Sequence, residues 1–311
     1  MNKAPRGVAL ISILFIVVLL SAIAYQVVLA QSLVIAQARQ NLDGSQSMAY
    51  ALGAESFARQ VLFEDWSAAT GGKKDTLLEA WAQPIAPFEI DNGVLQVQIR
   101  DMNSCFNLNS LSGSGSAANY PKLQTLLRNL SLDVQYADAW RDWVDPNLDV
   151  EGAGAEDGHY LLLQPAYRAP NSPVADVSEV RLIANMSRLE YEKLLPSICT
   201  LPTDSLKLNI NTANREAILA LHTSLSPTDI DPLILSPRDF GDVSEAVSIA
   251  SSLAAVVADL SVTSVYFSIQ IQVLYGDSVT EMATLVHRDA TNGEITLISR
   301  DFGKGFQSLF L

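Results

Sequence analysis

The sequence predicts an α+β protein with a long N-terminal transmembrane helix, an antiparallel sheet, and a large α-helical domain inserted between the strands of that sheet. Three observations support this fold class. Residues 7–38 carry no charged side chain. Strand-like alternation of apolar and polar residues occurs near residue 95 and returns after residue 265, and helical patterns fill the interval between them. One sheet divided in the sequence is the most economical arrangement.

The apolar run is long enough to cross a membrane. From Val8 to Ala30 almost every residue is Val, Ile, Leu, Ala or Phe, and about 23 helical residues span a hydrocarbon core of roughly 30 Å. Backbone polar groups in hydrocarbon must be satisfied internally, so the segment is expected to be helical. Lys3 and Arg6 precede it and favour a cytoplasmic N-terminus. The remainder holds all 34 acidic residues and is expected outside the cytoplasm.

Two other interpretations compete with a plain membrane anchor. A secretory signal peptide also has a basic start and an apolar middle, but this run is longer, and no small-x-small site precedes an obvious mature start. The second alternative resembles a prepilin leader, which is short and basic, ends in Gly, and is cleaved before an apolar helix that is retained. Gly7 followed by Val8 fits that pattern, while Ser12 stands where most pilin-like proteins carry Glu. We favour cleavage between Gly7 and Val8.

Composition limits the possible functions. The chain of 311 residues is 49% apolar, which allows a substantial core, and its length suggests two domains. The net charge of −14 disfavours phosphate backbones and suits divalent cations or basic protein partners. Cys105 and Cys199 are the two cysteines of the sequence. They are expected either to pair in an oxidising compartment or to be separate buried thiols.

The N-terminal helix is expected to continue beyond the membrane run. One of its faces is small and moderately apolar, and consists of Ala38, Leu42, Ser45, Ala49, Leu52 and Ser56. This face is expected to pack either on a sheet of the same chain or between parallel helices in a filament. A short helix from Asp75 to Trp81 is expected to follow, before Pro84 ends it.

Strands and further helices are predicted from periodicity. A hairpin is expected from Phe88 to Arg100 around the turn Asp91-Asn92-Gly93. Later strands are expected at residues 267–273, 281–287 and 294–299. Helical patterns occupy residues 123–130, 134–144, 176–186, 188–195, 213–221 and 244–260.

The densest acidic run lies between Asp142 and Asp157. If Asp145 is the first ligand position of a helix-flanked calcium loop, Asn147, Asp149 and Glu156 occupy the third, fifth and twelfth. Val150 replaces the Gly of the sixth position, so the match to a standard EF-hand is incomplete. We favour a calcium site with these four ligands and with Asp142 and Asp157. The alternative is a solvated acidic loop.

Residues 208–213, Leu-Asn-Ile-Asn-Thr-Ala, resemble the entry to a helix-hairpin-helix unit that binds DNA. Such a unit needs a glycine hairpin whose amides hold a phosphate. No glycine follows Leu221 in the next turn, and basic residues are few nearby. A structural use in binding protein is therefore favoured over DNA.

A catalytic role is not expected. The sequence contains no Gly-x-Ser-x-Gly elbow, His-Glu-x-x-His motif or Walker loop, and its three histidines have no zinc-ligand spacing. Two alternative functions are considered: a membrane-anchored periplasmic DNA-uptake protein, which should have a basic helical domain, and a periplasmic enzyme, which should show a nucleophile with its base.

Several stretches, taken in order, resemble the minor pseudopilin K family of type II secretion systems, also called general secretion pathway protein K. They are residues 6–10, 50–55, 100–109, 143–145, 154–157, 177–182 and 209–213. The resemblance covers nearly the whole chain. Absence of Glu at position 12 sets this family apart from other pseudopilins, so Ser12 agrees with it.

The resemblance implies a pilin-like fold with a leader (1–7), an N-terminal helix (8–38), a discontinuous head (39–104 and 261–311) and an inserted α-helical domain (105–260). It implies cleavage by prepilin peptidase, methylation, and a single span in the bacterial inner membrane with the C-terminal domain in the periplasm. Expected partners are minor pseudopilins I, J and H, and calcium is the expected structural cofactor. The implied function is to prime or cap a pseudopilus at its tip for protein export across the outer membrane.

Overall fold

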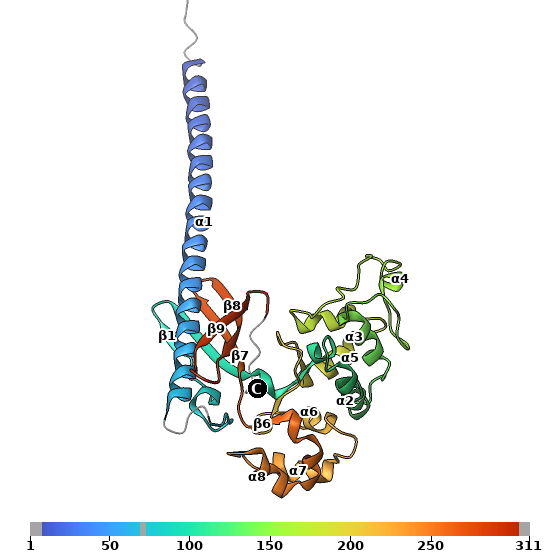
Figure 1. Ribbon diagram of the computed structural model, residues 1–311. Helices are drawn as coiled ribbons and strands as arrows, with labels where there is room; N and C mark the ends of the chain where they lie inside the picture. The colour runs from blue at the N-terminus through green and yellow to red at the C-terminus, as the bar shows by residue number, and fades with distance from the viewer. Residues whose placement is uncertain (1–7, 69–72, 305–311) are drawn as a thin grey trace, which may run out of the picture.

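The computed structural model describes residues 8–68 and 73–304. The first element, α1 (Val8–Ser67), is a single helix of 60 residues. Its N-terminal half projects away from the rest of the molecule (Figure 1), and its side chains from Ala9 to Leu42 are exposed. Gly7 lies outside the described residues, and Val8 begins the helix.

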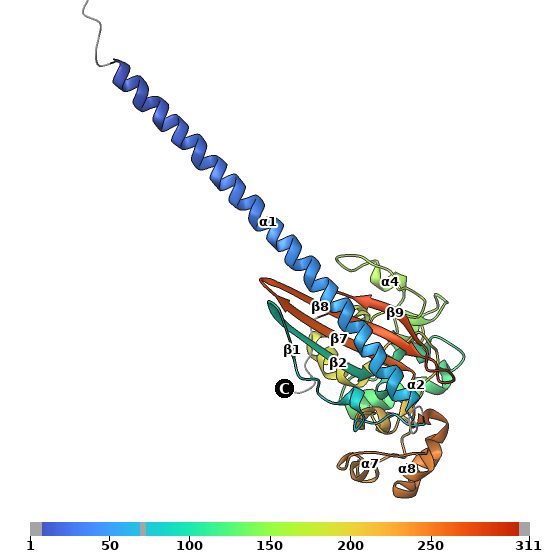
Figure 2. The same ribbon diagram turned by 90° about the vertical axis from the view of Figure 1, so that its left-hand side faces the viewer.

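The C-terminal half of α1 lies across one face of a five-stranded antiparallel sheet (Figure 2). The strands are β1 (Phe88–Ile90), β2 (Gly93–Asp101), β7 (Tyr266–Tyr275), β8 (Ser278–Arg288) and β9 (Ile295–Asp301), and this is also their order in the sheet. The central pair is β2 with β7, in which Val97 faces Ile271. Because β7 follows β2 in the sheet but not in the chain, the sheet is divided in the sequence, as predicted.

The face of α1 that contacts the sheet differs from the predicted one. Its buried residues are Ser47, Ala51, Ala54, Glu55, Ala58 and Leu62. These lie on the side of the helix opposite Leu42, Ala49 and Ser56, which are exposed. The predicted face therefore does not pack on the sheet of its own chain. The pattern misled because Ser47 donates to Thr280 at 2.7 Å and Glu55 pairs with Arg300 at 2.6 Å, so polar residues occupy buried positions.

The inserted domain leaves the sheet after β2 and returns before β7. The short 3₁₀ helix η2 (Met102–Ser104) links β2 to this domain, where η denotes a 3₁₀ helix. The helices of the domain are η3 (Leu108–Leu111), α2 (Ser116–Asn129), α3 (Tyr136–Val144), α4 (Asp157–Tyr160), η4 (Val177–Leu182), α5 (Arg188–Leu194), η5 (Leu195–Ser197), α6 (Arg215–Ala220), α7 (Pro227–Ile234), α8 (Val243–Ile249) and η6 (Ser251–Asp259). Its short strands are β3 (Phe106–Asn107), β4 (Ile198–Cys199), β5 (Leu208–Asn209) and β6 (Leu260–Ser261). The predicted α+β fold class is confirmed.

Some predicted helices are shorter than expected. Residues 75–81 form no α-helix, and the 3₁₀ turn η1 (Ala80–Ala82) is found there. The expected helix of residues 176–186 is the 3₁₀ segment η4, and that of residues 244–260 is divided into α8 and η6 at Ala250. Periodicity of apolar residues does not distinguish an α-helix from 3₁₀ turns in these segments, because both bury residues three or four apart.

Buried apolar side chains form two large clusters with no residue in common. One lies between α1 and the sheet and includes Leu62, Trp81 and Phe267. The other extends from Phe106 to Leu260 in the inserted domain. Trp140 and Trp143, each 2% exposed, belong to the second cluster, and Trp140 donates to the Leu108 carbonyl at 3.0 Å.

The inserted domain contains the same hydrogen-bond arrangement twice. We call residues 106–199 the first unit and residues 208–261 the second unit. Each begins with a short strand that pairs in parallel with the strand at its end, β3 with β4 and β5 with β6. Each then continues into a helix, α2 or α6, and these two helices pack against each other.

The repeated feature is an Asn-x-Asn segment at the start of each unit. In the first unit the side chain of Asn109 donates to the Val174 carbonyl and accepts the Val174 amide, each at 2.9 Å. In the second unit the side chain of Asn211 donates to the Phe240 carbonyl at 3.0 Å and accepts the Phe240 amide at 2.9 Å. Two residues further along, Asp176 and Asp242 each begin the sequence Asp-Val-Ser-Glu and accept the amide of the Ser at 2.8 Å. The interval between Asn and Asp is about twice as long in the first unit, because that unit also contains the acidic loop.

Candidate functional site

The acidic loop joins α3 to α4 in the first unit and continues towards η4, at the side of the inserted domain that carries α4 (Figure 1). Asp142 lies on α3 and Glu156 precedes α4, so both ends of the loop are fixed by helices. Asp145, Asn147 and Asp149 lie between them. The predicted ligand residues therefore belong to one continuous surface segment with a buried base.

Asp142 is fully buried at the base of the loop. Its two carboxylate oxygens accept the Glu151 amide, each at 3.2 Å. Burial raises the pKa of Asp142 to about 7, and the charges of Glu156, Asp145 and Glu151 add to the rise. Asp142 is thus a buried carboxylate whose charged neighbours include three other carboxylates.

Glu156 is the least satisfied side chain of the loop. It is 4% exposed, and neither of its buried carboxylate oxygens has a hydrogen-bond partner. Burial raises its pKa and the charge of Asp145 adds to the rise, while the Asn171 side chain and the Asp157 amide, which lie near the carboxylate without forming a well-aligned hydrogen bond, oppose it. The Oδ1 of Asn171 is likewise buried without a partner, while its Nδ2 donates to the Asn147 carbonyl at 2.9 Å. Buried polar groups are normally hydrogen-bonded, so three buried oxygens without a partner are unusual in a folded protein.

The loop is shaped by two side chains that accept amides two residues ahead. Asp145 Oδ1 accepts the Asn147 amide at 3.2 Å, and Asn147 Oδ1 accepts the Asp149 amide at 2.7 Å. Asn147 and Asp149 are exposed. A Cβ on Gly154 would come within 2.0 Å of the Asp142 carboxylate, so only glycine lets the chain pass so close to it.

Two carboxylates of the run have cationic partners. Asp157 pairs with Arg168 at 2.5 Å and accepts the Ala169 amide at 3.2 Å, and Glu151 pairs with Arg141. The predicted ligand Asp157 is thus paired with a cation, whereas Asp142 accepts only the Glu151 amide and Glu156 pairs with no cation among the described residues. The remaining predicted ligands are Asp142, Asp145, Asn147, Asp149 and Glu156, to which the structure adds Asn171. Among the described residues, no three carboxylates of this loop bring their oxygens within 4.8 Å of one another, so the structure does not gather them around one point. Their oxygens match the preference of calcium for carboxylate and amide ligands.

Asn171 was missed by the sequence analysis. It lies beyond α4 and outside any ligand spacing, and its position is known only from the folded chain. Its backbone has a φ of 46°, in the left-handed region that Asn tolerates better than most residues. A lone Asn in a loop of Pro, Ala and Ser gives no signal that would have identified it.

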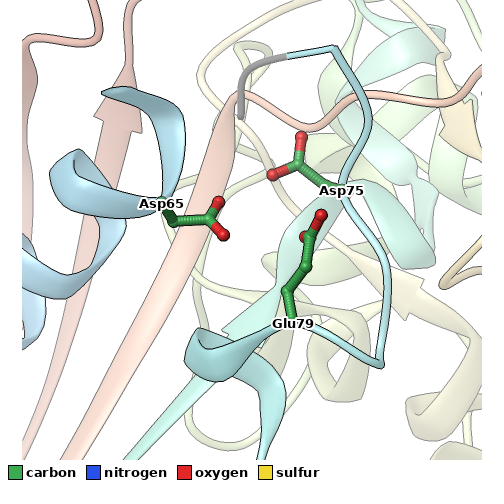
Figure 3. A group of neighbouring side chains, drawn as sticks. All are labelled: Asp65, Asp75 and Glu79. Carbon is green, nitrogen blue, oxygen red and sulfur yellow. The ribbon is translucent and has the colours of Figure 1, made fainter. Parts of the chain in front are cut away.

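A second acidic group lies in the head (Figure 3). The ligand oxygens of Asp65, Asp75 and Glu79 lie within 4.8 Å of one another. Arg288, which is 2% exposed, pairs with Asp75 and with Asp65, the latter at 3.3 Å. Glu79 accepts the Thr76 amide and the Trp81 indole N–H, each at 2.9 Å. These contacts make the group a buried ion-pair network with its own cation.

Cys105 and Cys199 form a disulfide in the structure, with their Cα atoms 5.8 Å apart. It joins the start of the first unit to β4, which ends that unit. The two sulfurs are buried beside Leu201, against Met102, Tyr266 and Leu285 of the head.

Comparison with known proteins gives consistent results. The family model for the type II secretion system protein K matches residues 104–203. The type II secretion system protein K of Pseudomonas aeruginosa is 32% identical over 98% of this chain and 95% of its own length. That of Klebsiella pneumoniae is 36% identical over 71% of each chain. In the crystal structure of the GspK-GspI-GspJ complex from enterotoxigenic Escherichia coli, one chain matches with a TM-score of 0.76 at 25% identity, over 86% of this chain and all of that one.

Proposed function

The chain belongs to the type II secretion system protein K family of minor pseudopilins, and we propose that it occupies the tip of a pseudopilus, where it primes or caps assembly. The observation that carries this proposal is the position of the inserted domain. Its α7 and α8 extend past the end of α1 that is distant from the apolar segment (Figures 1 and 2). A further subunit stacked beyond the head would meet this domain.

The N-terminal segment supports the same proposal. α1 contains a stretch of 18 residues that is apolar enough to cross a membrane, and none of it is buried within the molecule. We propose that this segment anchors the chain once in the inner membrane, with the head in the periplasm, and that prepilin peptidase cleaves between Gly7 and Val8. Ser12 replaces the Glu that in other pseudopilins is thought to pair with the N-terminus of the preceding subunit. A subunit without that carboxylate needs no neighbour ahead of it, which suits a tip position.

The proposed partners are the minor pseudopilins I and J, with H as a further one. The similar structure is that of a GspK-GspI-GspJ complex, which supports the first two. The test is co-purification: the full-length chain with an affinity tag, solubilised in detergent, should retain co-expressed I and J pseudopilins. Labelling of intact pseudopili should place this chain at one end. Retention of neither partner, or labelling along the filament length, would contradict the proposal.

We also propose that the acidic loop binds calcium as a structural ion. The three buried oxygens of Glu156 and Asn171 without partners support a cation, since a solvated loop would leave such oxygens in water. Asp142, Asp145, Asn147 and Asp149 would supply further oxygens. When bound, the ion would neutralise the mutually repelling carboxylates and join α3 to α4. A structural ion, tip placement and partner contacts together describe assembly rather than catalysis.

A further inference from the structure

The inserted domain is connected to the head by two crossings of the chain, after β2 and before β7. The two large apolar clusters share no residue, and between them lies only the small cluster around Cys105, Cys199 and Leu201 among the described residues. Domains connected in this way normally move relative to each other unless their interface is large and apolar. What fixes the inserted domain to the head must therefore be sought among polar contacts.

Asp101, the last residue of β2, is the centre of such contacts and is 2% exposed. Its Oδ1 accepts the Asn103 amide at 2.7 Å, and its Oδ2 accepts the Ser264 hydroxyl at 2.6 Å. From the inserted domain, Thr212 Oγ1 and Asn209 Nδ2 also donate to Oδ2, the latter at 3.3 Å. The buried Asp101 carboxylate thus accepts hydrogen bonds from residues that precede the inserted domain, belong to it and follow it.

Asn209 extends these contacts to a fourth segment. Its Nδ2 donates to the Asp75 carbonyl at 3.0 Å and lies 2.8 Å from the Ser264 hydroxyl. Asp75 is fully buried, accepts the Ser264 amide at 2.7 Å, and pairs with Arg288 of β8. Asn209 therefore connects the second unit to the ion-pair network inside the head.

The first unit provides an internal comparison. Asn107 occupies the position that Asn209 has in the second unit. Its Nδ2 donates to the carbonyls of Thr203 and Ser205 at 2.7 and 3.0 Å, and its Oδ1 accepts the Leu201 amide at 3.0 Å. All three lie in the segment that leads to the second unit. The first Asn of each pair therefore connects its unit to the adjoining body. The second Asn holds a backbone segment of its own unit, and Asn109 in addition donates to the Leu201 carbonyl at 2.9 Å.

We propose that Asp101, Asn209, Thr212 and Ser264 form a joint that holds the inserted domain in one orientation relative to the head. This assigns a structural role to residues 209–212, whose sequence resembles a DNA-binding entry. A fully satisfied buried polar network is rigid, because moving one member leaves the others unpaired in a region from which water is excluded. The joint makes the head and the inserted domain one rigid body.

The test measures orientation in the full-length protein in detergent. Spin labels on non-natural amino acids at Ser56 of α1 and Leu189 of α5, both exposed, report the distance between the two bodies. The unmodified protein should give one narrow distance distribution. Asn209→Ala removes the Nδ2 contacts to Asp101, Asp75 and Ser264 and should broaden the distribution about twofold, as expected for domains free to move.

Asn211→Ala is the matched control. Asn211 lies two residues after Asn209 in the same motif, but its side chain hydrogen-bonds to the backbone of Phe240 within the second unit. It should lower stability and leave the distribution narrow. A narrow distribution in folded Asn209→Ala, or a broad one in the unmodified protein, overturns the proposal.

If Asn209→Ala does not fold, Thr212→Val and Ser264→Ala each remove one hydroxyl donor from Asp101 with little change in volume. The double variant should broaden the distribution, and an unchanged width would equally overturn the proposal. Because the measured distance lies within one chain, its outcome is independent of tip placement and of calcium binding.

Discussion

The two units of the inserted domain share a framework and differ in what stabilises them. Both have an Asn-x-Asn start, a clamp on a distant backbone segment, and a parallel strand pair that closes the unit. The first unit adds a disulfide and an acidic loop with buried, unpartnered oxygens. The second has neither. The framework therefore accommodates a long insertion, provided that other interactions fix the added chain.

The disulfide is the largest expected difference between the units. Cys199 lies beside Asn107 in the parallel pair of the first unit, and Ser261 takes the same place beside Asn209 in the second. A loop of nearly one hundred residues contributes about 4.7 kcal/mol in the chain-entropy treatment, less any strain. The double variant Cys105→Ala, Cys199→Ala should lose free energy of unfolding of about that size in chemical denaturation. Mass mapping without reduction that finds both thiols free would reject the pairing.

The joint should make attachment of the second unit depend on pH. Burial raises the pKa of Asp101 to about 6, and the charge of Asp75 adds to the rise, while donors from Ser264, Thr212 and Asn103 oppose it. The folded state thus binds the Asp101 proton more tightly than the unfolded chain, so this residue's contribution to stability is greatest at low pH. Stability should fall by up to about 3 kcal/mol as the pH rises from about 4 to 6.

Asp101→Asn checks this expectation. The amide cannot titrate, so the fall between pH 4 and 6 should become shallower in thermal unfolding. In the first unit, Asn107 contacts backbone groups, among them those of Leu201, Thr203 and Ser205. Its hydrogen bonds therefore involve no titrating side chain that corresponds to Asp101, and no such pH dependence is expected from them. An unchanged pH profile in Asp101→Asn would show that other groups cause the dependence.

The two clamps share one arrangement but differ in burial and in one contact. Asn109 and Asn211 are each 1% exposed and hold the amide and the carbonyl of one residue. Asn109 also donates to the Leu201 carbonyl at 2.9 Å, and all of its contacts are buried, whereas the Phe240 groups held by Asn211 are half-buried. Asn109→Ala should therefore cost about 3 kcal/mol and Asn211→Ala less, because unpaired groups that reach water cost less. Urea unfolding of the two variants checks this order, and a larger loss for Asn211→Ala would contradict it.

Removal of calcium should affect the first unit alone. An ion that binds only the folded form stabilises it by about 2.7 kcal/mol at a hundredfold excess over Kd. Chelation should lower the melting temperature, and calcium should restore it better than magnesium at equal ionic strength, since magnesium favours smaller octahedral sites. Glu156→Gln should weaken the response. Glu192→Gln, on an exposed residue paired with Arg188, is the control and should leave it unchanged.

The sequence predicted those features that periodicity determines. Alternation at residues 95–99 and 267–273 located the central strands, and the interval between them identified the insertion. Of the two alternatives for the small face of α1, packing on its own sheet is wrong, because the sheet-facing side includes Ser47 and Glu55, which are buried against polar partners that only the fold brings near. A pattern based on hydrophobicity places such residues in water. Packing between helices of a filament stays a prediction.

The candidate site was predictable only in part. The spacing from Asp145 to Glu156 located the loop, but it could not show that Glu156 is buried while Asp149 is exposed. Asn171 lies outside the spacing altogether. The repeat was hidden because the interval between the Asn pair and the Asp-Val-Ser-Glu segment differs so much between the units. Those contacts join residues far apart in the chain, which local patterns do not report.

Hydrogen exchange of the full-length protein, with calcium and with magnesium at matched ionic strength, tests the central claim most directly. The claim is that the first unit depends on an ion and the second does not. We predict that calcium slows exchange of amides between residues 142 and 171 and in the adjoining α3 and α4, while amides of residues 208–261 exchange as before. Equal protection of both units, or equal effects of the two ions, would contradict the account.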